Sequence, residues 1–212
     1  MRVLLLLLAL TSSLLVACSR QSPTLVCQLP FNGVVLAAGD SLTRGYGAEG
    51  NGYVEQLQER LQGDGIHSDV QVLNRGQNGE KSGELLQRLP ELMAQTQPDV
   101  VVLTSGGNDF LRRVQAAETA ANLNSIIDLV NHHGAMPVIF AVPEPGLGAI
   151  AGLMSDHPVY ATLAERGDLV VIGEVVAQAI SDDATRSDRI HPNALGYAHM
   201  ATSAFEVLSQ CQ

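Results

Sequence analysis

The sequence predicts a three-layer α/β fold built on a parallel sheet. Five short runs rich in Val, Ile and Leu recur along the chain, and none alternates strictly between apolar and polar residues, which is typical of strands covered on both faces. Segments with helical spacing separate these runs, and strand–helix alternation favours a parallel sheet with right-handed crossovers. Five strands give the flavodoxin-like order as the first expectation. The predicted strands are 34–38, 70–73, 100–104, 138–142 and 169–172.

Four amphipathic helices are predicted between and after these strands, each with apolar residues three or four positions apart. Their stripes are Tyr53, Leu57 and Leu61; Leu85, Leu89 and Leu92; Leu123, Ile127 and Val130; and Tyr197, Met200, Ala204, Phe205 and Leu208. Pro90 should kink or split the second helix. Gly134 should end the third helix as a C-cap, and Asn193 should begin the last one as an N-cap.

Length and composition suit one domain and exclude several classes of protein. The chain has 212 residues, 46% of them hydrophobic and 16% charged, with a formal net charge of −10. The acidic balance argues against a nucleic-acid binder and against an electrostatic grip on anionic lipid. Three cysteines are too few for a disulfide scaffold or a four-cysteine zinc site. No histidine has a partner at metal-binding spacing, so we expect no metal.

Residues 1–17 are predicted to be an export signal. Arg2 precedes an unbroken apolar run that is too short to span a bilayer comfortably. The stretch Leu15-Val16-Ala17-Cys18 resembles the bacterial lipobox, which implies cleavage before Cys18 and lipid on its thiol and new amino group. Several acyl chains give stable anchoring. The residue after Cys18 is Ser19, which resembles the signal for sorting to the outer membrane. We therefore expect a protein of the bacterial cell envelope, anchored through Cys18 at the periplasmic face of the outer membrane; an ordinary secretory signal is the alternative.

Residues 18–32 contain two prolines and no hydrophobic period, so we expect a lipidated tether ahead of a single domain over residues 33–212. Cys27 and Cys211 then lie near the two ends of the mature chain. In an oxidising compartment they could form a disulfide, because domain termini often lie close together. Two separate thiols are the alternative. We expect a monomer.

Polar residues gather in four stretches that we expect to lie at the carboxyl ends of the strands. Ligands of open parallel sheets bind outside the carboxyl ends of the strands. The four stretches are Gly39-Asp40-Ser41-Leu42, Asn74-Arg75-Gly76-Gln77-Asn78-Gly79, Gly106-Gly107-Asn108-Asp109 and Asp188-Arg189-Ile190-His191-Pro192. Together they supply a hydroxyl, an imidazole, a carboxylate, an amide and several glycine N–H groups.

These are the groups that acyl transfer needs. A serine hydroxyl is a poor nucleophile until a base takes its proton, and His191 is the candidate base for Ser41. Asp188 would fix the tautomer and orientation of that imidazole. The expected donors to the oxyanion of the tetrahedral intermediate are Ser41 N–H, Gly79 N–H and the side-chain amide of Asn108. We expect Asp40 and Asp109 to brace their loops rather than react.

The four stretches, in this order, resemble the sequence blocks of SGNH (GDSL-type) hydrolases, in particular the bacterial thioesterase/lysophospholipase/arylesterase branch. The similarity runs from Val34 to Leu208 and includes AAGDSLTRGYG, RLPEL, GGNDFLR and DRIHPNALGYAHMA. The resemblance implies a nucleophile at Ser41, oxyanion donors at Gly79 and Asn108, and Asp188 and His191 as the rest of a triad. It also implies hydrolysis of small-molecule esters and thioesters, such as aryl esters, acyl thioesters and lysophospholipids, without metal or organic cofactor.

Substrate specificity stays open at this point. The stretch 143–154 is unusually apolar, and four of its residues could line an acyl groove: Leu147, Ile150, Leu153 and Met154. The alternative is an amphipathic turn packed on the core. A shallow polar cleft would instead favour an O-acetyl esterase acting on envelope polysaccharide or peptidoglycan. A non-catalytic envelope-binding lipoprotein is the remaining alternative, and the presence of every matched catalytic residue argues against it.

Overall fold

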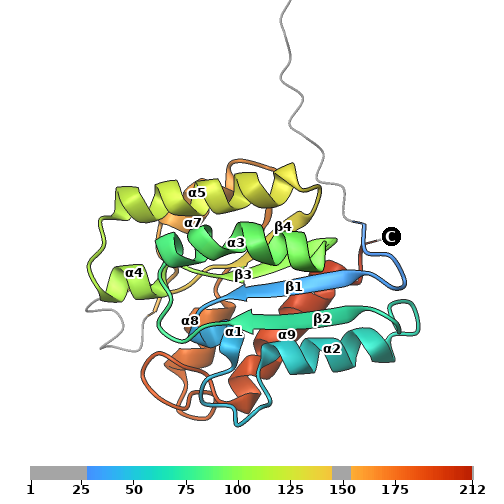
Figure 1. Cartoon of the computed structure of the whole chain (residues 1–212). Helices are drawn as coiled ribbons and strands as arrows, with labels where there is room; N and C mark the ends of the chain where they lie inside the picture. The colour runs from blue at the N-terminus through green and yellow to red at the C-terminus, as the bar shows by residue number, and fades with distance from the viewer. Residues whose placement is uncertain (1–27, 145–153, 212) are drawn as a thin grey trace, which may run out of the picture.

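A five-stranded parallel sheet forms the middle layer of the structure (Figure 1). The computed structural model describes residues 28–144 and 154–211. Its strands are β1 (Val34–Gly39), β2 (Gln71–Gly76), β3 (Val100–Thr104), β4 (Met136–Phe140) and β5 (Val170–Ile172). They lie in the order β2-β1-β3-β4-β5, and all neighbouring strands are parallel. The predicted α/β fold and its flavodoxin-like strand order are therefore confirmed.

β2 is longer than the predicted strand. Its pairing with β1 continues to the pair of Gly39 with Gly76, so Asn74 and Arg75 lie in the strand and not in the loop where we expected them. The Asn74 side chain also donates to Glu55 of the neighbouring helix at 3.0 Å. Asn74 and Arg75 thus pair with β1 although their side chains are polar, because the strand is held by backbone hydrogen bonds.

β4 begins two residues earlier than predicted and includes Pro137. The Met136 N–H donates to the Asp99 carbonyl on the β3 side, at 2.9 Å. Because backbone N–H groups alternate along a strand, the position of the absent Pro137 N–H faces β5. The pairing of β5 begins only opposite Val138, so no ladder bond is lost, and proline is tolerated where no partner strand needs its donor.

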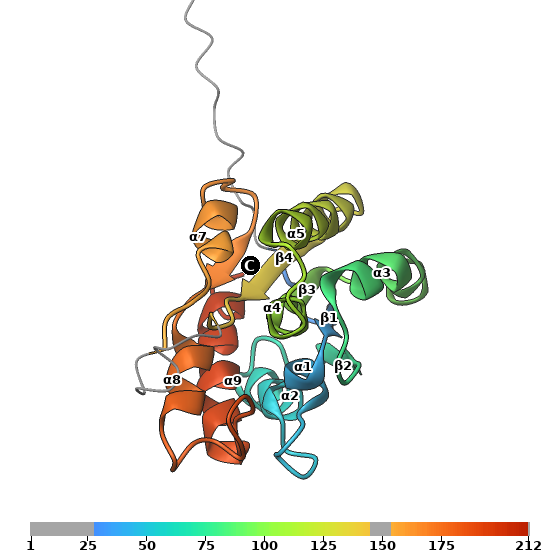
Figure 2. The same cartoon turned by 90° about the vertical axis from the view of Figure 1, so that its left-hand side faces the viewer.

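Helices cover both faces of the sheet. On one face lie α3 (Ser82–Thr96), α5 (Ala116–His132) and α7 (Val159–Ala164); on the other lie α2 (Tyr53–Gly63), α8 (Val175–Ser181) and α9 (Ala194–Leu208) (Figures 1 and 2). Two short helices, α1 (Ser41–Arg44) and α4 (Gly107–Leu111), follow β1 and β3 at the carboxyl edge of the sheet.

α3 continues through Pro90, so the predicted split is wrong. The buried stripe is Leu85, Leu89 and Met93, while Pro90 lies on the exposed face and Leu92 is only half-buried. Proline has no N–H, so the helix lacks the bond that this position would donate to the Leu86 carbonyl. Packing of the buried stripe holds the helix together, since tertiary contacts supply most helical stability in proteins.

The predicted helix caps are present. The Asn193 side chain accepts from the N–H groups of Leu195 at 2.9 Å and Gly196 at 3.2 Å, as an N-cap does. Gly134 follows the end of α5 with a φ of 78°, a left-handed conformation that favours glycine. These local features fix where α9 begins and where β4 can start.

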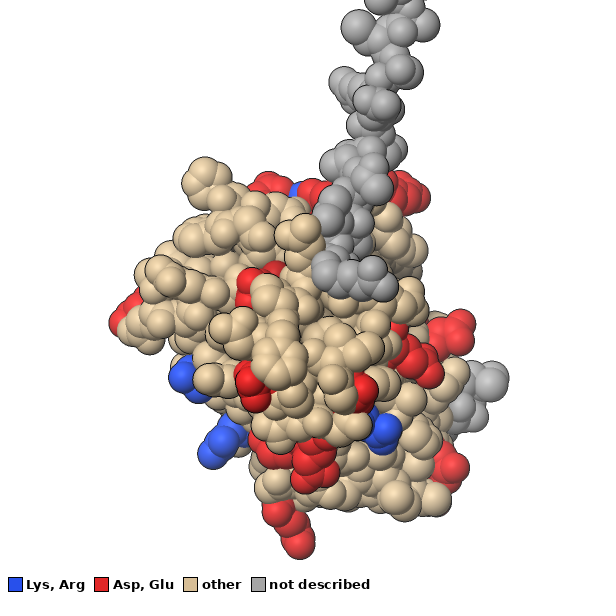
Figure 3. Space-filling model, turned by 90° about the vertical axis from the view of Figure 1, so that its right-hand side faces the viewer, with Lys and Arg blue, Asp and Glu red and all other residues tan. Residues whose placement is uncertain are grey.

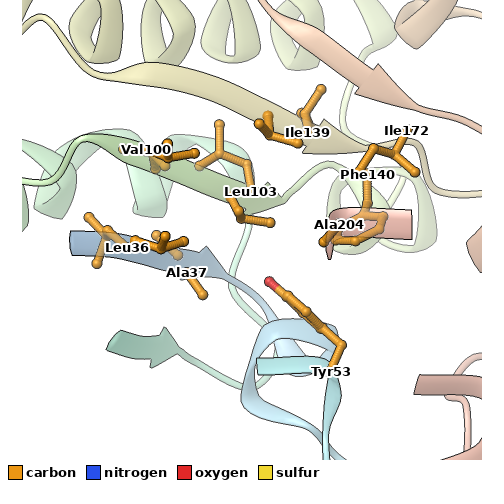
Figure 4. Close-up of a cluster of buried hydrophobic side chains, with 14 of the residues drawn as sticks. Leu36, Ala37, Tyr53, Val100, Leu103, Ile139, Phe140, Ile172 and Ala204 are labelled. Atoms are coloured by element: carbon orange, nitrogen blue, oxygen red, sulfur yellow. The ribbon is translucent and has the colours of Figure 1, made fainter. Parts of the chain in front are cut away.

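The core fills the spaces between the sheet and both helical layers. Figure 4 shows side chains of β1, β3 and β4 together with Tyr53 of α2, Ile172 of β5 and Ala204 of α9. The rings of Tyr53 in α2 and Phe140 at the end of β4 lie 5.2 Å apart in an edge-on arrangement. The Tyr53 hydroxyl also lies 3.1 Å from the Thr43 hydroxyl in α1. This packing fixes the carboxyl edge of the sheet relative to the core.

The described chain starts and ends at the amino edge of the sheet, opposite the carboxyl edge (Figures 1 and 2). Cys211 is buried there and is disulfide-bonded. Its predicted partner Cys27 lies outside the described residues, as do the predicted signal and Cys18, so the pairing, the signal and the lipidation remain predictions. Within residues 28–144 and 154–211, no helix is both long and apolar enough to cross a bilayer.

Candidate active site

The turn between β1 and α1 positions Ser41. Asp40, the residue before it, accepts hydrogen bonds from the Leu42 N–H and the Thr104 hydroxyl, both at 3.0 Å. The Asp40 N–H donates to the Thr104 carbonyl at 3.1 Å. The expected bracing role of Asp40 is therefore confirmed, and Ser41 is held between the ends of β1 and β3.

Ser41, His191 and Asp188 form a continuous hydrogen-bonded chain. The His191 Nε2 atom lies 2.9 Å from the Ser41 hydroxyl oxygen, across 150 residues of sequence. The other ring nitrogen, Nδ1, lies 2.8 Å from Asp188 Oδ2. The structure thus brings together the three residues predicted as nucleophile, base and orienting carboxylate, in the arrangement that activates a serine.

Asp188 is held as an ionised acceptor. Its Oδ1 accepts from the N–H groups of Ile190 at 2.8 Å and His191 at 2.9 Å. Partial burial raises the pKa of Asp188, but the hydrogen bonds from Ile190 and His191 outweigh burial and leave it lowered overall. The side chain is 46% exposed. The carboxylate is therefore charged at neutral pH and can stabilise an imidazolium.

Tyr46 packs against the His191 imidazole, a contact that the sequence did not reveal. Its ring centroid lies 4.6 Å from that of His191, with the planes at 44°. The Tyr46 carbonyl accepts from the Tyr197 hydroxyl of α9 at 3.0 Å, which ties this turn to the helix after His191. The Tyr46 side chain is 51% exposed.

A buried network lies behind the nucleophile. Besides its bond to Asp40, the Thr104 hydroxyl lies 2.6 Å from that of Thr43, which in turn reaches Tyr53. Burial raises the pKa of Asp40 to about 7; the nearby Glu80 carboxylate adds to this effect, and the bonds from Leu42 and Thr104 oppose it. Asp40 is thus a carboxyl group that titrates near neutrality inside the fold.

The three predicted oxyanion donors have no acceptor of their own. Among the described residues, no protein acceptor takes a hydrogen bond from Ser41 N–H, Gly79 N–H or the Asn108 side-chain amide. Asn108 lies in α4 and lines the same cavity as Ser41. Gly79 follows β2 with a φ of 77° and is not among the cavity-lining residues. All three N–H groups remain free to bind a ligand oxygen.

Asp109 holds the loop beside Asn108, as expected. Its carboxylate accepts from the Ser82 N–H at 2.8 Å and the Ser82 hydroxyl at 2.5 Å. These bonds tie α4 to the start of α3, so the loops after β2 and β3 keep a fixed relation.

A cavity of about 590 Å³ opens beside the Ser41 hydroxyl and is also lined by His191 and Asn108. Most of its remaining lining is apolar: Leu42, Leu111, Val142, Pro143, Met154, Val176, Ile180 and Ile190. Met154 of the predicted acyl groove is therefore a lining residue. The other three groove residues, Leu147, Ile150 and Leu153, lie outside the described residues. Among those described, no three His, Cys, Asp or Glu side chains cluster as metal ligands.

The sequence of the described domain matches a known family. The model of the GDSL-like lipase/acylhydrolase family matches residues 37–199, a range that contains the whole hydrogen-bonded chain from Asp188 to Ser41. The chain belongs to this family. Within this range, Ser41 and His191 meet at the carboxyl edge of the sheet.

Curated relatives and solved structures agree with this family. The chain is 35% identical over 112 residues to Esterase TesA of Pseudomonas aeruginosa, a match that covers 52% of this chain and 55% of that protein. It is 29% identical over 160 residues to Thioesterase 1/protease 1/lysophospholipase L1 of Escherichia coli, covering 75% of each. The first match thus spans about half the length of the relative. The crystal structure of TesA superposes with a TM-score of 0.73 at 27% identity, covering 84% of this chain and 98% of that one.

Proposed function

We propose that this chain is a serine esterase that hydrolyses carboxylic esters and thioesters through an acyl-enzyme on Ser41. The observation that carries the proposal is the unbroken chain of hydrogen bonds from Asp188 through His191 to the Ser41 hydroxyl at a cavity wall. Such a chain makes a serine hydroxyl nucleophilic at neutral pH.

The reaction follows from these positions. His191 Nε2 takes the Ser41 proton while the oxygen attacks the acyl carbonyl carbon, and Asp188 stabilises the resulting imidazolium. Ser41 N–H and the Asn108 amide at the cavity wall donate to the oxyanion, and Gly79 N–H is the third donor that the family resemblance implies. As the tetrahedral intermediate collapses, His191 gives the proton to the leaving oxygen or sulfur. A water molecule activated by His191 then releases the acid and restores Ser41.

The cavity supports acyl esters as the substrate class. Apolar side chains from α8, α4 and the segment after β4 line it beside Ser41, and burial of methylene groups favours binding of an acyl chain. This lining fits aryl esters, acyl thioesters and lysophospholipids better than an O-acetylated sugar, which needs polar walls. The names of the relatives, esterase and thioesterase/lysophospholipase, point to the same class.

Covalent labelling tests the nucleophile. A fluorophosphonate should label the wild-type chain at Ser41, and Ser41→Ala should lose labelling together with roughly 10⁴-fold or more of its kcat on an aryl ester. Ser105→Ala is the matched control, because the Ser105 hydroxyl is buried at the same edge and has no hydrogen-bond partner within residues 28–144 and 154–211. Near-normal turnover in Ser41→Ala would refute the proposal.

We also propose that the protein is a lipoprotein of the bacterial envelope. The support is the lipobox-like stretch that ends in Cys18 after an apolar leader. Cells fed an alkyne fatty acid should incorporate it into the wild-type chain and into Cys27→Ser, whereas Cys18→Ser should incorporate none. Membrane fractionation of the same strains locates the anchor. Incorporation that survives in Cys18→Ser would exclude this cysteine as the lipidated residue.

A further inference from the structure

Arginine side chains gather at the cavity although the chain as a whole is acidic. The formal net charge is −10, yet Arg186 and Arg189 both line the cavity. The opposite, amino edge is different, and acidic groups outnumber basic ones on the face shown in Figure 3. Loops that lead into the strands there carry Asp64, Asp69, Asp99, Glu165 and Asp168. The cavity at the carboxyl edge thus has two guanidinium groups in its wall, together with the carboxyl groups of Asp40 and Glu144.

Arg189 is available to bind a ligand. Its side chain is exposed and forms no ion pair or hydrogen bond with any described residue. Arg186 is half-buried and pairs with Asp183, which is itself exposed. Glu144 also lines the cavity but lies in the segment after β4, where it interacts with His157. An unpaired guanidinium at a cavity wall is well suited to phosphate, which it can bind through two parallel hydrogen bonds.

The position of the two arginines in the sequence indicates which part of a substrate they would meet. Both belong to the loop that carries His191, two and five residues before it. His191 must lie beside the leaving group, because it donates a proton to the departing oxygen or sulfur. Val176 and Ile180 of α8 line the same cavity and give it apolar surface that an acyl chain can contact. The arginines therefore lie on the alcohol or thiol side of the ester.

We propose that Arg189, assisted by Arg186, binds a phosphate group on the alcohol or thiol portion of the substrate. The inference rests on the proposed esterase function and narrows its substrate class to phosphorylated acyl esters or thioesters. An acylated glycerophosphate and an acyl thioester of a phosphorylated thiol share this chemistry. Arg189 acts as a specificity-determining residue, and the reaction at Ser41 stays the same for neutral esters.

Three soluble substrates with one acyl chain test the proposal: 1-octanoylglycerol, 1-octanoylglycerol 3-phosphate and octanoyl-coenzyme A. Arg189→Gln should lower kcat/KM for the phosphorylated substrates by roughly fivefold, the size of an exposed ion pair, and Arg189→Glu should lower it further. Neither variant should change kcat/KM for the neutral ester more than about twofold. Added salt should reduce the wild-type preference for the phosphorylated substrates, because it screens exposed charges.

Arg60→Gln is the matched control, because Arg60 is an exposed arginine in the last turn of α2 that does not line the cavity. It should leave all three rates unchanged. A selective loss on the glycerophosphate or on the thioester supports the site and identifies the source of the phosphate.

Equal losses on neutral and phosphorylated substrates would overturn the proposal and assign Arg189 to positioning the His191 loop. Unchanged rates on all three substrates would overturn it too. If the wild-type chain cleaves none of the substrates and Ser41 takes no fluorophosphonate, the proposed function fails instead.

Discussion

Among single residues, Asn108 has the clearest mechanistic signature. Its side-chain amide lines the cavity and has no protein acceptor among the described residues. Because charge on the carbonyl oxygen develops in the transition state, Asn108→Ala should lower kcat by about 10²–10³-fold with little change in KM. Steady-state kinetics on an aryl ester measure both, with the exposed Asn51→Ala as control. A change in KM alone would make Asn108 a substrate-binding residue.

The raised pKa of Asp40 implies that the free energy of unfolding depends on pH. Burial raises its pKa from 3.8 to about 7 in the folded state, so between these values the folded chain keeps a proton that the unfolded chain has lost. The protonated Asp40 carboxyl therefore contributes fully to the free energy of unfolding below about pH 4, and this contribution is lost as the pH rises towards 7. Asp40→Asn can still accept from Leu42 N–H and should be more stable than wild type at pH 8, by on the order of a few kcal/mol, but not at pH 4.

Urea unfolding at pH 4 and pH 8 checks this difference. Asp69→Asn, an exposed carboxylate at the amino edge, serves as the control and should follow wild type at both values. Identical pH profiles for Asp40→Asn and wild type would show that Asp40 does not titrate inside the fold.

At this scale the sequence identified the three residues that the structure joins in one hydrogen-bonded chain, but not their surroundings. Ser41, Asp188 and His191 could be predicted because each stands in a short polar motif after or before a recognisable element. Tyr46 could not, because its contact with the imidazole depends on how its turn packs against α9. The Asp40–Thr104 bond joins residues 64 positions apart, and no periodicity encodes such a contact.

Between elements, the junction of β1 and α1 depends on Gly39. Its φ is 145°, and a Cβ atom there would overlap the Thr104 carbonyl oxygen of β3. Gly39→Ala should therefore force β1 and β3 apart and cost roughly 2–3 kcal/mol or more in the free energy of unfolding. It should also lower kcat, because Ser41 moves with the strand end.

Gly50→Ala is the matched control for this junction. Gly50 also has a positive φ, of 87°, but no heavy atom lies within 4 Å of its Cβ position. It should show only backbone strain of about 1 kcal/mol. Chemical denaturation and aryl-ester kinetics compare the two variants, and equal effects would mean that contact with Thr104 is unimportant.

The order and type of the helices and strands could be predicted from hydrophobic periodicity, but some of their boundaries could not. The neighbouring strand sets these boundaries: β2 extends to Gly76 because β1 continues opposite it. Pro137 was excluded from a strand and Pro90 was expected to break a helix. Pro137 is accommodated because β5 does not pair at that position, and Pro90 because packing of the buried stripe holds α3 together across the missing hydrogen bond. Both reasons depend on neighbouring elements.

For the whole molecule, we predict that a Cys27–Cys211 disulfide joins the two ends of the domain. Cys211 is buried and disulfide-bonded at the edge where the described chain begins. A bond that closes so long a loop should add about 2–5 kcal/mol to stability. Cys27→Ser should lower the melting temperature by as much as a reductant lowers that of the wild-type protein. Cys18→Ser, the control, should leave the melting temperature unchanged. Equal melting temperatures for Cys27→Ser and wild type would exclude this pairing.

The chain enters the sheet at the amino ends of its strands, and the cavity opens at the carboxyl ends, one strand length or about 20 Å away. Attachment of the protein through its N-terminal end, to a bilayer or to a chromatography bead, therefore leaves the cavity opening exposed to solvent. Immobilisation through residues ahead of Leu29 should therefore preserve access for dissolved esters, whereas coupling through Arg189 or its neighbours should obstruct it.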